Sequence, residues 1–366
     1  METYEQLKNE EYRQKIKTLV DEFPDYCVGY TNHLRDKQPR TRLSYLQDLK
    51  VFYDFLGQTN PDAQKFRYVD YSIEFLSKLS RDDIDEYVSW LEGHYTYSSK
   101  GKPIHHVNSA AGVKRKLSSL RRFFNYMVNI AEYLDMNPVA KVTMPKVKEK
   151  EIRTVEADEL DLLYQAYEDE YQKALKVIAN TPEEQLRYQT KLRPAIVKRD
   201  LAIFKLFLGT GLRISELVGI NTLDIRWDKA RINIVRKGGD HDHIYVSDDA
   251  FDAVADYMEN YRDQFSDFSE EDALFLSSKH CRLSPRQIEK TMKDYIELAV
   301  GKNTGITPHK LRATFGTNYY RYSKDIYATA TVLGHKSVET TKKHYAKPSE
   351  KAKEDMRNIN IYKIEE

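Results

Sequence analysis

The sequence predicts a mainly α-helical protein with a small antiparallel sheet, divided into two domains. The chain has 366 residues, which is more than one domain of average size holds. Apolar residues recur at helical spacing in several long stretches. Residues 232–235 and 243–246 have the β-branched and aromatic character of strands, and the glycines between them, Gly238 and Gly239, favour a hairpin turn.

The first part of the chain is expected to form a helical domain. Residues 21–58 have a helical pattern, and residues 79–94 predict a second helix with Ser80 at its N-cap. Residues 95–108 are polar and are predicted to be a loop, and residues 109–134 predict a long basic helix. The stripe within the first helix consists of Thr41, Leu43, Leu46, Leu49, Phe52, Phe55 and Leu56.

The domain boundary is expected where alternating charges replace apolar periodicity. We predict a helical domain at 1–145, a linker at 146–156, a second domain at 157–350 and a tail at 351–366. The apolar residues of the tail suit either packing on its own chain or docking on a neighbouring subunit. The later helices are predicted at 248–264, 284–299, 308–321, 324–333 and 348–357.

The charge is unevenly distributed, although the formal net charge is only +1. Lysine and arginine dominate residues 100–150, whereas aspartate and glutamate dominate residues 247–272. A basic segment in a nearly neutral protein indicates a surface for a polyanion, although a solvated helix face is an equal alternative. The candidate DNA contacts are Lys114, Lys116, Arg121 and Arg122.

Cysteine usage and the N-terminus favour a cytoplasmic, soluble protein. Cys27 and Cys281 lie far apart and outside any metal-binding spacing, so we expect reduced thiols. The N-terminus is charged and lacks the apolar core of a signal peptide. No apolar run approaches the length of a membrane span, so no membrane partner is expected.

Three motifs carry residue types suited to breaking a phosphodiester. They read TGLRISELVGI at 210–220, TPHKLRATFGT at 307–317 and LGHKSVETTKKHY at 333–345. Arg213 and Arg312 can clamp phosphate oxygens, because a guanidinium binds paired oxygens and stays charged. His309 and His335 can donate hydrogen bonds to the phosphate or assist deprotonation of a nucleophile.

Two further residues complete the predicted chemistry. Lys237, on the Gly-Gly hairpin, is a flexible cation able to protonate the leaving 5′ oxygen. Tyr345 is the predicted nucleophile, forming a phosphotyrosine bond that conserves the energy of the broken linkage. Each residue also has an ordinary explanation. Arg213, for example, lies three residues before Glu216, where a surface ion pair is common.

Taken together, the three motifs closely resemble those of the tyrosine recombinases. The resemblance covers the whole chain and implies a two-domain clamp around duplex DNA bearing a specific recombination site. It implies a 3′-phosphotyrosine intermediate, strand exchange by a homotetramer through a Holliday junction, and no metal, ATP or other cofactor. By this resemblance Glu216 is a structural acid that supports the active site. The catalytic set that it implies is Arg213, Lys237, His309, Arg312, His335 and, as nucleophile, Tyr345.

The sequence departs from the family pattern at two positions. Ala313 follows Arg312 where many relatives carry histidine. Tyr345 lies ten positions after His335, whereas nine is the usual spacing, which falls here on His344. One extra residue rotates a helical side chain by about 100°, so we expect a local loop or bulge to compensate.

Other functions stay open from the sequence alone. Within the recombinases, the chain resembles Xer-like enzymes that resolve chromosome or plasmid dimers, with a mobile-element integrase as the alternative. A catalytically silent DNA-binding relative and a type IB topoisomerase are two further alternatives. His241 and His243 fall on one side of a predicted strand, but a third metal ligand is not apparent, so no metal site is predicted.

Overall fold

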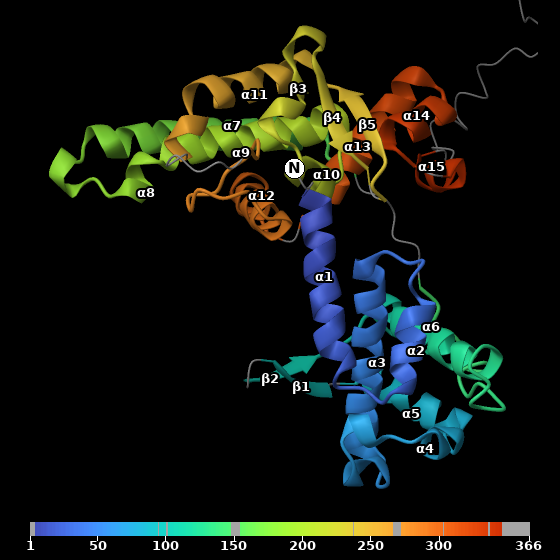
Figure 1. Cartoon of the computed structure of the whole chain (residues 1–366). Coiled ribbons are helices and arrows are strands. Elements are labelled where there is room, and N and C mark those ends of the chain that lie inside the picture. The colour runs from blue at the N-terminus through green and yellow to red at the C-terminus, as the bar shows by residue number, and fades with distance from the viewer. Residues whose placement is uncertain are drawn as a thin grey trace, which may run out of the picture. The chain divides into compact units, whose positions relative to one another are not determined.

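This computed structural model describes residues 4–93, 95–99, 102–147, 154–236, 238–265, 272–302, 304–335 and 337–345 (Figure 1). In residues 95–99, 102–106 and 343–345 the backbone alone is described. The chain divides into two compact units, unit 1 at Met1–Lys150 and unit 2 at Glu151–Glu366. The division lies inside the segment predicted as a linker, 146–156. The helix predicted at 348–357 and the tail at 351–366 lie outside the described residues.

Unit 1 is helical, with one two-stranded hairpin (Figure 1). Its helices are α1 Tyr4–Val20, α2 Tyr26–His33, α3 Pro39–Thr59, α4 Ile73–Ser77, α5 Arg81–Glu92 and α6 Ala110–Asn129. Short 3-10 turns occupy Ala63–Lys65 and Tyr68–Asp70, and the strands are β1 Tyr95–Ser99 and β2 Lys102–His106.

The core of unit 1 forms around α3 and α6, as the predicted apolar stripe requires. Phe52 is fully buried and meets Tyr87 of α5 edge-on at 5.1 Å and Phe124 of α6 at 6.2 Å between ring centroids. The helix predicted at 79–94 is confirmed, because Ser80 and Asp83 form a reciprocal capping box at the start of α5.

Two predictions for unit 1 are wrong. The helical pattern at 21–58 forms two helices, because the chain turns between α2 and α3 and Pro39 begins the second helix, where its missing N–H costs nothing. The segment at 95–108, predicted to be a loop, forms the antiparallel pair β1–β2, with Tyr97 opposite Ile104. Its polar composition hid the alternation that marks a strand.

Unit 2 is built from helices and one three-stranded antiparallel sheet (Figure 1). The helices are α7 Ala157–Ala179, α8 Tyr188–Lys191, α9 Arg193–Thr210, α10 Ile214–Val218, α11 Asp248–Asn260, α12 Pro285–Ala299, α13 Pro308–Ser323, α14 Ile326–Leu333 and α15 Val338–Tyr345. The strands are β3 Ile225–Arg226, β4 Arg231–Val235 and β5 His241–Tyr245, and 3-10 turns occupy Glu183–Gln185, Thr222–Asp224, Trp227–Lys229 and Arg262–Phe265.

Helix α9 is the central element of unit 2. It is apolar on several sides, and α7, α11, α12 and α13 pack around it (Figure 1). Phe204 and Phe207 are almost fully buried there, and Phe204 also packs against Tyr167 of α7. The predicted hairpin is confirmed, since β4 pairs with β5 and Ile232 lies opposite Ile244. The mainly helical fold with a small antiparallel sheet is therefore confirmed.

The described helices of the chain do not span a membrane. None of them combines the length and the apolar character that crossing a bilayer requires.

The two cysteines are predicted to react at very different rates. Cys27 is fully buried, and burial raises the pKa of its thiol to about 12, whereas Cys281 is exposed. Because the thiolate is the reactive form, Cys27 is almost entirely in the unreactive thiol form at neutral pH. Titration with a disulfide reagent should give one fast thiol, with the second reacting as unit 1 unfolds. Cys281→Ser should remove the fast phase, and a fast phase that persists in that variant would contradict the buried placement of Cys27.

Candidate active site

Arg213, Arg312 and His335 come from three separate motifs, and the fold brings them together at the C-terminal end of α14. Arg213 Nη2 donates to the carbonyl of Gly334 at 3.1 Å, and Arg312 Nη2 donates to the carbonyl of Leu333 at 2.5 Å. His335 follows directly in the chain. The predicted clustering of these residues is therefore present in unit 2.

A third arginine, Arg236 at the end of β4, binds the same helix end. Its Nη2 donates to the carbonyl of Val332 at 3.2 Å. The last carbonyls of a helix lack intrahelical partners and lie at the negative end of the helix dipole. Three successive carbonyls, at residues 332–334, thus each accept a hydrogen bond from a different guanidinium.

Glu216 fixes Arg213 through local helix geometry. Arg213 is the N-cap of α10 and Glu216 is its third residue, and the Glu216 carboxylate accepts both from the backbone and from the side chain of Arg213. Glu216 Oε2 accepts from the backbone N–H of Arg213 at 2.9 Å, and Oε1 accepts from its Nη1 at 2.6 Å. Only 2% of Glu216 is exposed. A buried carboxylate with these bonds holds the guanidinium in one orientation before any ligand arrives.

Arg312 ties three helices together. Besides Leu333, it donates from Nη1 to the carbonyl of Gly211, the residue that ends α9. Gly211 has a left-handed backbone, with φ of +62°, and a Cβ there would lie 2.3 Å from Cδ1 of Phe315 on α13. The first and second motifs therefore meet through one glycine and one buried arginine.

His335 is positioned by the turn that ends α14. Gly334 adopts a left-handed conformation, and the backbone N–H of His335 donates to the carbonyl of Ala330 at 2.9 Å, as in a Schellman turn. Its Nδ1 shares a hydrogen bond of 2.8 Å with Oγ1 of Thr341, which is fully buried in α15. The imidazole is therefore oriented from both α14 and α15.

His309 and Ala313 lie on α13, on either side of Arg312. His309 is exposed in the first turn, after the N-cap Thr307, whereas Arg312 one turn later is buried. Ala313 is also buried, with 8% exposed. The position that carries histidine in many relatives is therefore occupied here by a small core residue.

The structure describes two of the predicted catalytic residues less fully. Lys237 lies outside the described residues. Tyr345 is the last residue of α15, where the backbone alone is described. The bulge expected before Tyr345 is absent from the described helix, because α15 runs without interruption from Val338.

The predicted DNA contacts on α6 separate into two groups. Lys116 is buried and donates to Asn108 at 2.7 Å, and Arg121 donates to the carbonyls of Val139 and Val142. Both cations support unit 1, which argues against their predicted role at a DNA surface. Lys114 is exposed and Arg122 lies over the Tyr45 ring, and their role stays a prediction.

Asp242, which lies between His241 and His243, is the partner of Arg236. Its Oδ2 accepts from Arg236 Nε at 2.9 Å. Burial opposes the charged form, but the hydrogen bonds from Arg236 and from the backbone of His243 hold the pKa of this carboxyl below its usual range. Among the described residues, no group of three or more His, Cys, Asp or Glu side chains is arranged for a metal ion.

Arg236 is the residue of this cluster that sequence reasoning missed. It precedes Lys237 in the hairpin, and its charge gave no reason to separate it from other surface arginines. The sequence feature that could have identified Arg236 is Asp242, six residues later, because a hairpin brings the two residues close together. Its contacts with Glu216 and Val332 depend on tertiary structure.

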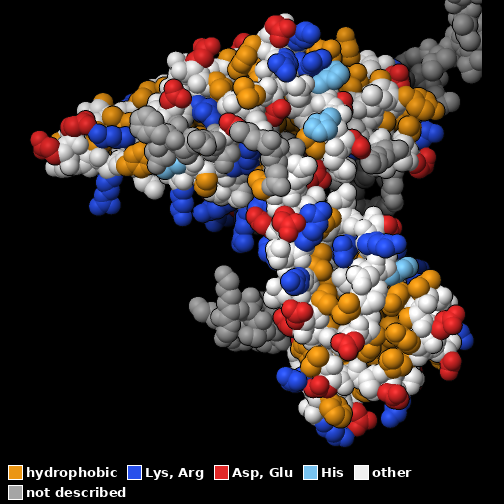
Figure 2. All heavy atoms as spheres, viewed as in Figure 1, with side chains coloured by type: hydrophobic (Ala, Val, Ile, Leu, Met, Phe, Trp, Pro, Cys, Tyr) orange, Lys and Arg blue, Asp and Glu red, His pale blue; other side chains and the backbone are white. Residues whose placement is uncertain are grey.

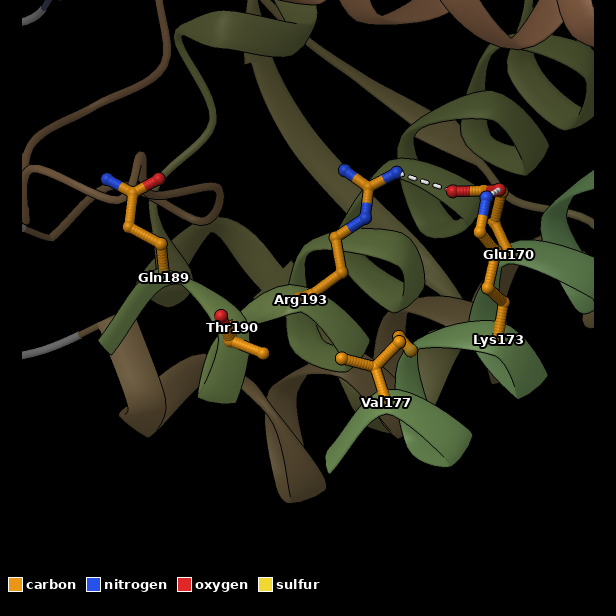
Figure 3. A pocket seen from close by; sticks show the side chains of 7 residues that line it. Glu170, Lys173, Val177, Gln189, Thr190 and Arg193 are labelled. Carbon is orange, nitrogen blue, oxygen red and sulfur yellow. Dashed lines mark hydrogen bonds and ion pairs between the residues drawn. The ribbon is translucent and has the colours of Figure 1, made fainter. Parts of the chain in front are cut away.

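A shallow hollow of about 270 Å³ lies elsewhere in unit 2, between α7 and the start of α9 (Figure 3). Arg193 donates to Glu170 across it at 2.8 Å, and Val177 lines its floor. The cluster described above lies at the other end of α9, roughly 25 Å away along the helix axis. This hollow is therefore separate from the candidate active site.

Comparison with known proteins agrees with this geometry. The phage integrase family matches residues 153–352, which is more than half of the chain. Tyrosine recombinase XerC of Caldanaerobacter subterraneus is 27% identical over 89% of this chain and 82% of its own. Tyrosine recombinase XerS of Streptococcus pyogenes is 27% identical over 92% of this chain and 95% of its own.

Solved structures show the same fold. XerH recombinase bound to a palindromic difH substrate has a TM-score of 0.61 at 15% identity, covering 90% of this chain and 82% of its own. Lambda integrase (75–356) bound to a core site has a TM-score of 0.54 at 18% identity, covering 87% of this chain and 93% of its own. The chain belongs to the phage integrase family, that of the tyrosine recombinases.

Proposed function

We propose that this protein cleaves and rejoins DNA at a specific site, with Tyr345 as nucleophile. The Tyr345 oxygen bonds to phosphorus while the bond from phosphorus to the 5′ oxygen breaks, leaving a 3′-phosphotyrosine. The tyrosine proton passes to a base, for which the histidines are the candidates, and Lys237 protonates the leaving 5′ oxygen. A homotetramer exchanges the strands through a Holliday junction, and no cofactor takes part.

The arginine cluster suits the charge that develops on the phosphate. Arg213 and Arg312 are held by backbone carbonyls, and Arg213 also by Glu216. Donors that are fixed in advance stabilise a transition state without reorganising during the reaction. His335, oriented by Thr341, contributes a further donor to a phosphate bound at this place.

The position of Tyr345 on α15 is the observation that carries this proposal. Thr341 faces His335, and Tyr345 lies four residues later, so both positions share one face of the helix. His344, which has the usual family spacing from His335, is rotated by about 100° from that face. The spacing of ten residues between His335 and Tyr345 is therefore compatible with Tyr345 as the nucleophile.

Replacement of Tyr345 by phenylalanine should abolish covalent attachment and leave DNA binding intact. The phenyl ring keeps the shape of the side chain but lacks the attacking oxygen. The measurement is trapping of protein on a nicked suicide substrate, which lets the cleaved 5′ end diffuse away. Tyr322→Phe, the same change at an exposed position of α13, is the matched control and should trap like the native protein. Equal trapping by Tyr345→Phe would exclude this nucleophile.

Helix α12 is the element of unit 2 best suited to contact the DNA backbone. Ser284 and Gln287 form a capping box at its start, and its apolar face is buried. Arg286, Lys290 and Lys293 are exposed and spaced four and three residues apart, so they share one face. Figure 2 shows Lys and Arg side chains along the edge of unit 2 where α8 and α12 lie.

Removing two of these cations should weaken DNA binding and reduce its salt dependence. For Arg286→Ala with Lys290→Ala, the slope of log affinity against log salt should become shallower by about 2. The measurement is a fluorescence titration with duplex DNA at several salt concentrations. Lys173→Ala with Lys176→Ala on α7 removes the same charge from an exposed helix and should leave the slope nearly unchanged. Equal effects of both pairs would contradict a specific role for α12.

Within this proposal the protein is Xer-like and resolves chromosome or plasmid dimers in the cytoplasm. Its support is the alignment with proteins named XerC and XerS, the second of which extends over nearly the whole of both chains.

Genome-wide mapping of DNA bound by Tyr345→Phe tests this role. Occupancy should concentrate at one site on the chromosome or on a plasmid, because dimer resolution needs one site per replicon. The alternative, a mobile-element integrase, predicts occupancy at the ends of the element that carries the gene. The second pattern would contradict the Xer-like role while leaving the cleavage chemistry unaffected.

A further inference from the structure

We infer that Arg236 is a positioning residue for the cleavage site. In this inference it aligns Glu216 and the end of α14, which in turn orient Arg213 and His335 toward the phosphate. The inference rests on the proposed cleavage function and adds a residue to it.

Arg236 has three anchors on three different elements. Its Nε donates to Asp242 on β5 at 2.9 Å, its Nη1 to Glu216 on α10 at 3.4 Å, and its Nη2 to the carbonyl of Val332 on α14 at 3.2 Å. Each nitrogen of the guanidinium therefore serves one element. A planar fork of this kind fixes the relative placement of all three partners, which a lysine ammonium does not do.

The partners of Arg236 indicate that it acts through other residues. Only 9% of its side chain is exposed, compared with 23% for Arg213. The residues that Arg236 contacts support the residues proposed to bind the phosphate. Glu216 holds Arg213, and Val332 lies three residues before His335. Arg236 is thus placed to support the phosphate clamp from inside the fold.

The packing around Gly334 makes the position of Arg236 sensitive to small changes. A Cβ on Gly334 would lie 2.8 Å from both Cζ and Nε of Arg236. The glycine therefore lets the guanidinium lie directly against the turn that carries His335. Moving Arg236 by even a fraction of a bond length is expected to disturb that turn, because interiors are close-packed.

A buried ion pair far from the cluster provides a matched control. Arg199 is 5% exposed, donates to Asp200 from Nη2 at 2.7 Å and donates to the carbonyl of Leu276 from Nη1 at 2.8 Å. It thus resembles Arg236 in burial and in its kinds of partner. Loss of either guanidinium leaves a buried carboxylate, so both substitutions should destabilise unit 2.

The experiment compares Arg236→Met, Arg236→Lys and Arg199→Met in the full-length protein. Three quantities are measured for each: the melting temperature, the dissociation constant for duplex DNA, and the single-turnover rate of covalent trapping at saturating DNA. The rate is measured well below the melting temperature of every variant. Trapping by the native protein comes first, because its failure would refute the proposed function and not this inference.

Arg236→Met should slow trapping by about 100-fold, since a misplaced catalytic group costs that order of rate, while DNA affinity changes by less than about threefold. Arg236→Lys keeps the charge but not the fork, so its rate should lie between those of Arg236→Met and the native protein. Arg199→Met should lower the melting temperature comparably yet trap at nearly the native rate.

A native trapping rate in Arg236→Met would overturn the inference. A loss of rate in Arg199→Met as large as that in Arg236→Met would also overturn it, because the effect would then follow from destabilisation alone.

Discussion

The end of helix α14 is the feature on which the arrangement of the active site depends. Its last carbonyls, at residues 332–334, accept from Arg236, Arg312 and Arg213 in turn. Three guanidinium groups at one place repel each other, and two carboxylates, those of Glu216 and Asp242, offset this repulsion. The helix end thus brings three arginines together at one place.

This arrangement explains how residues from distant motifs act at one place. Arg213 begins α10, Arg312 lies on α13, and the turn at Gly334 carries His335. The carbonyl ends of α9 and α14 both bind Arg312, so the helices are fixed relative to one another by hydrogen bonds to a single side chain. Under the proposed function, this arrangement holds the phosphate clamp in place through contacts within the protein.

The observed secondary structure agreed with the sequence-based prediction wherever a single local pattern determined it. The apolar stripe of α3, the capping box at Ser80 and the glycine hairpin between β4 and β5 were predictable, because each depends on residues close together in the chain. The strands β1 and β2 were not, since their polar residues lack a strand pattern. The roles of Lys116 and Arg121 were also hidden, because a charge on a basic helix does not reveal whether Asn108 or a loop carbonyl binds it.

The sequence by itself determined the fold class, the family and the candidate catalytic residues, because motif order and spacing are properties of the chain. Only the tertiary structure showed that Arg236 belongs to the same cluster, because its contacts to Glu216 and Val332 join positions up to 96 residues apart. It also showed that α15 extends without interruption to position 345, one turn beyond Thr341, which contacts His335. A sequence motif specifies which side chains are present. Hydrogen bonds from the arginines to the ends of helices determine where those side chains lie.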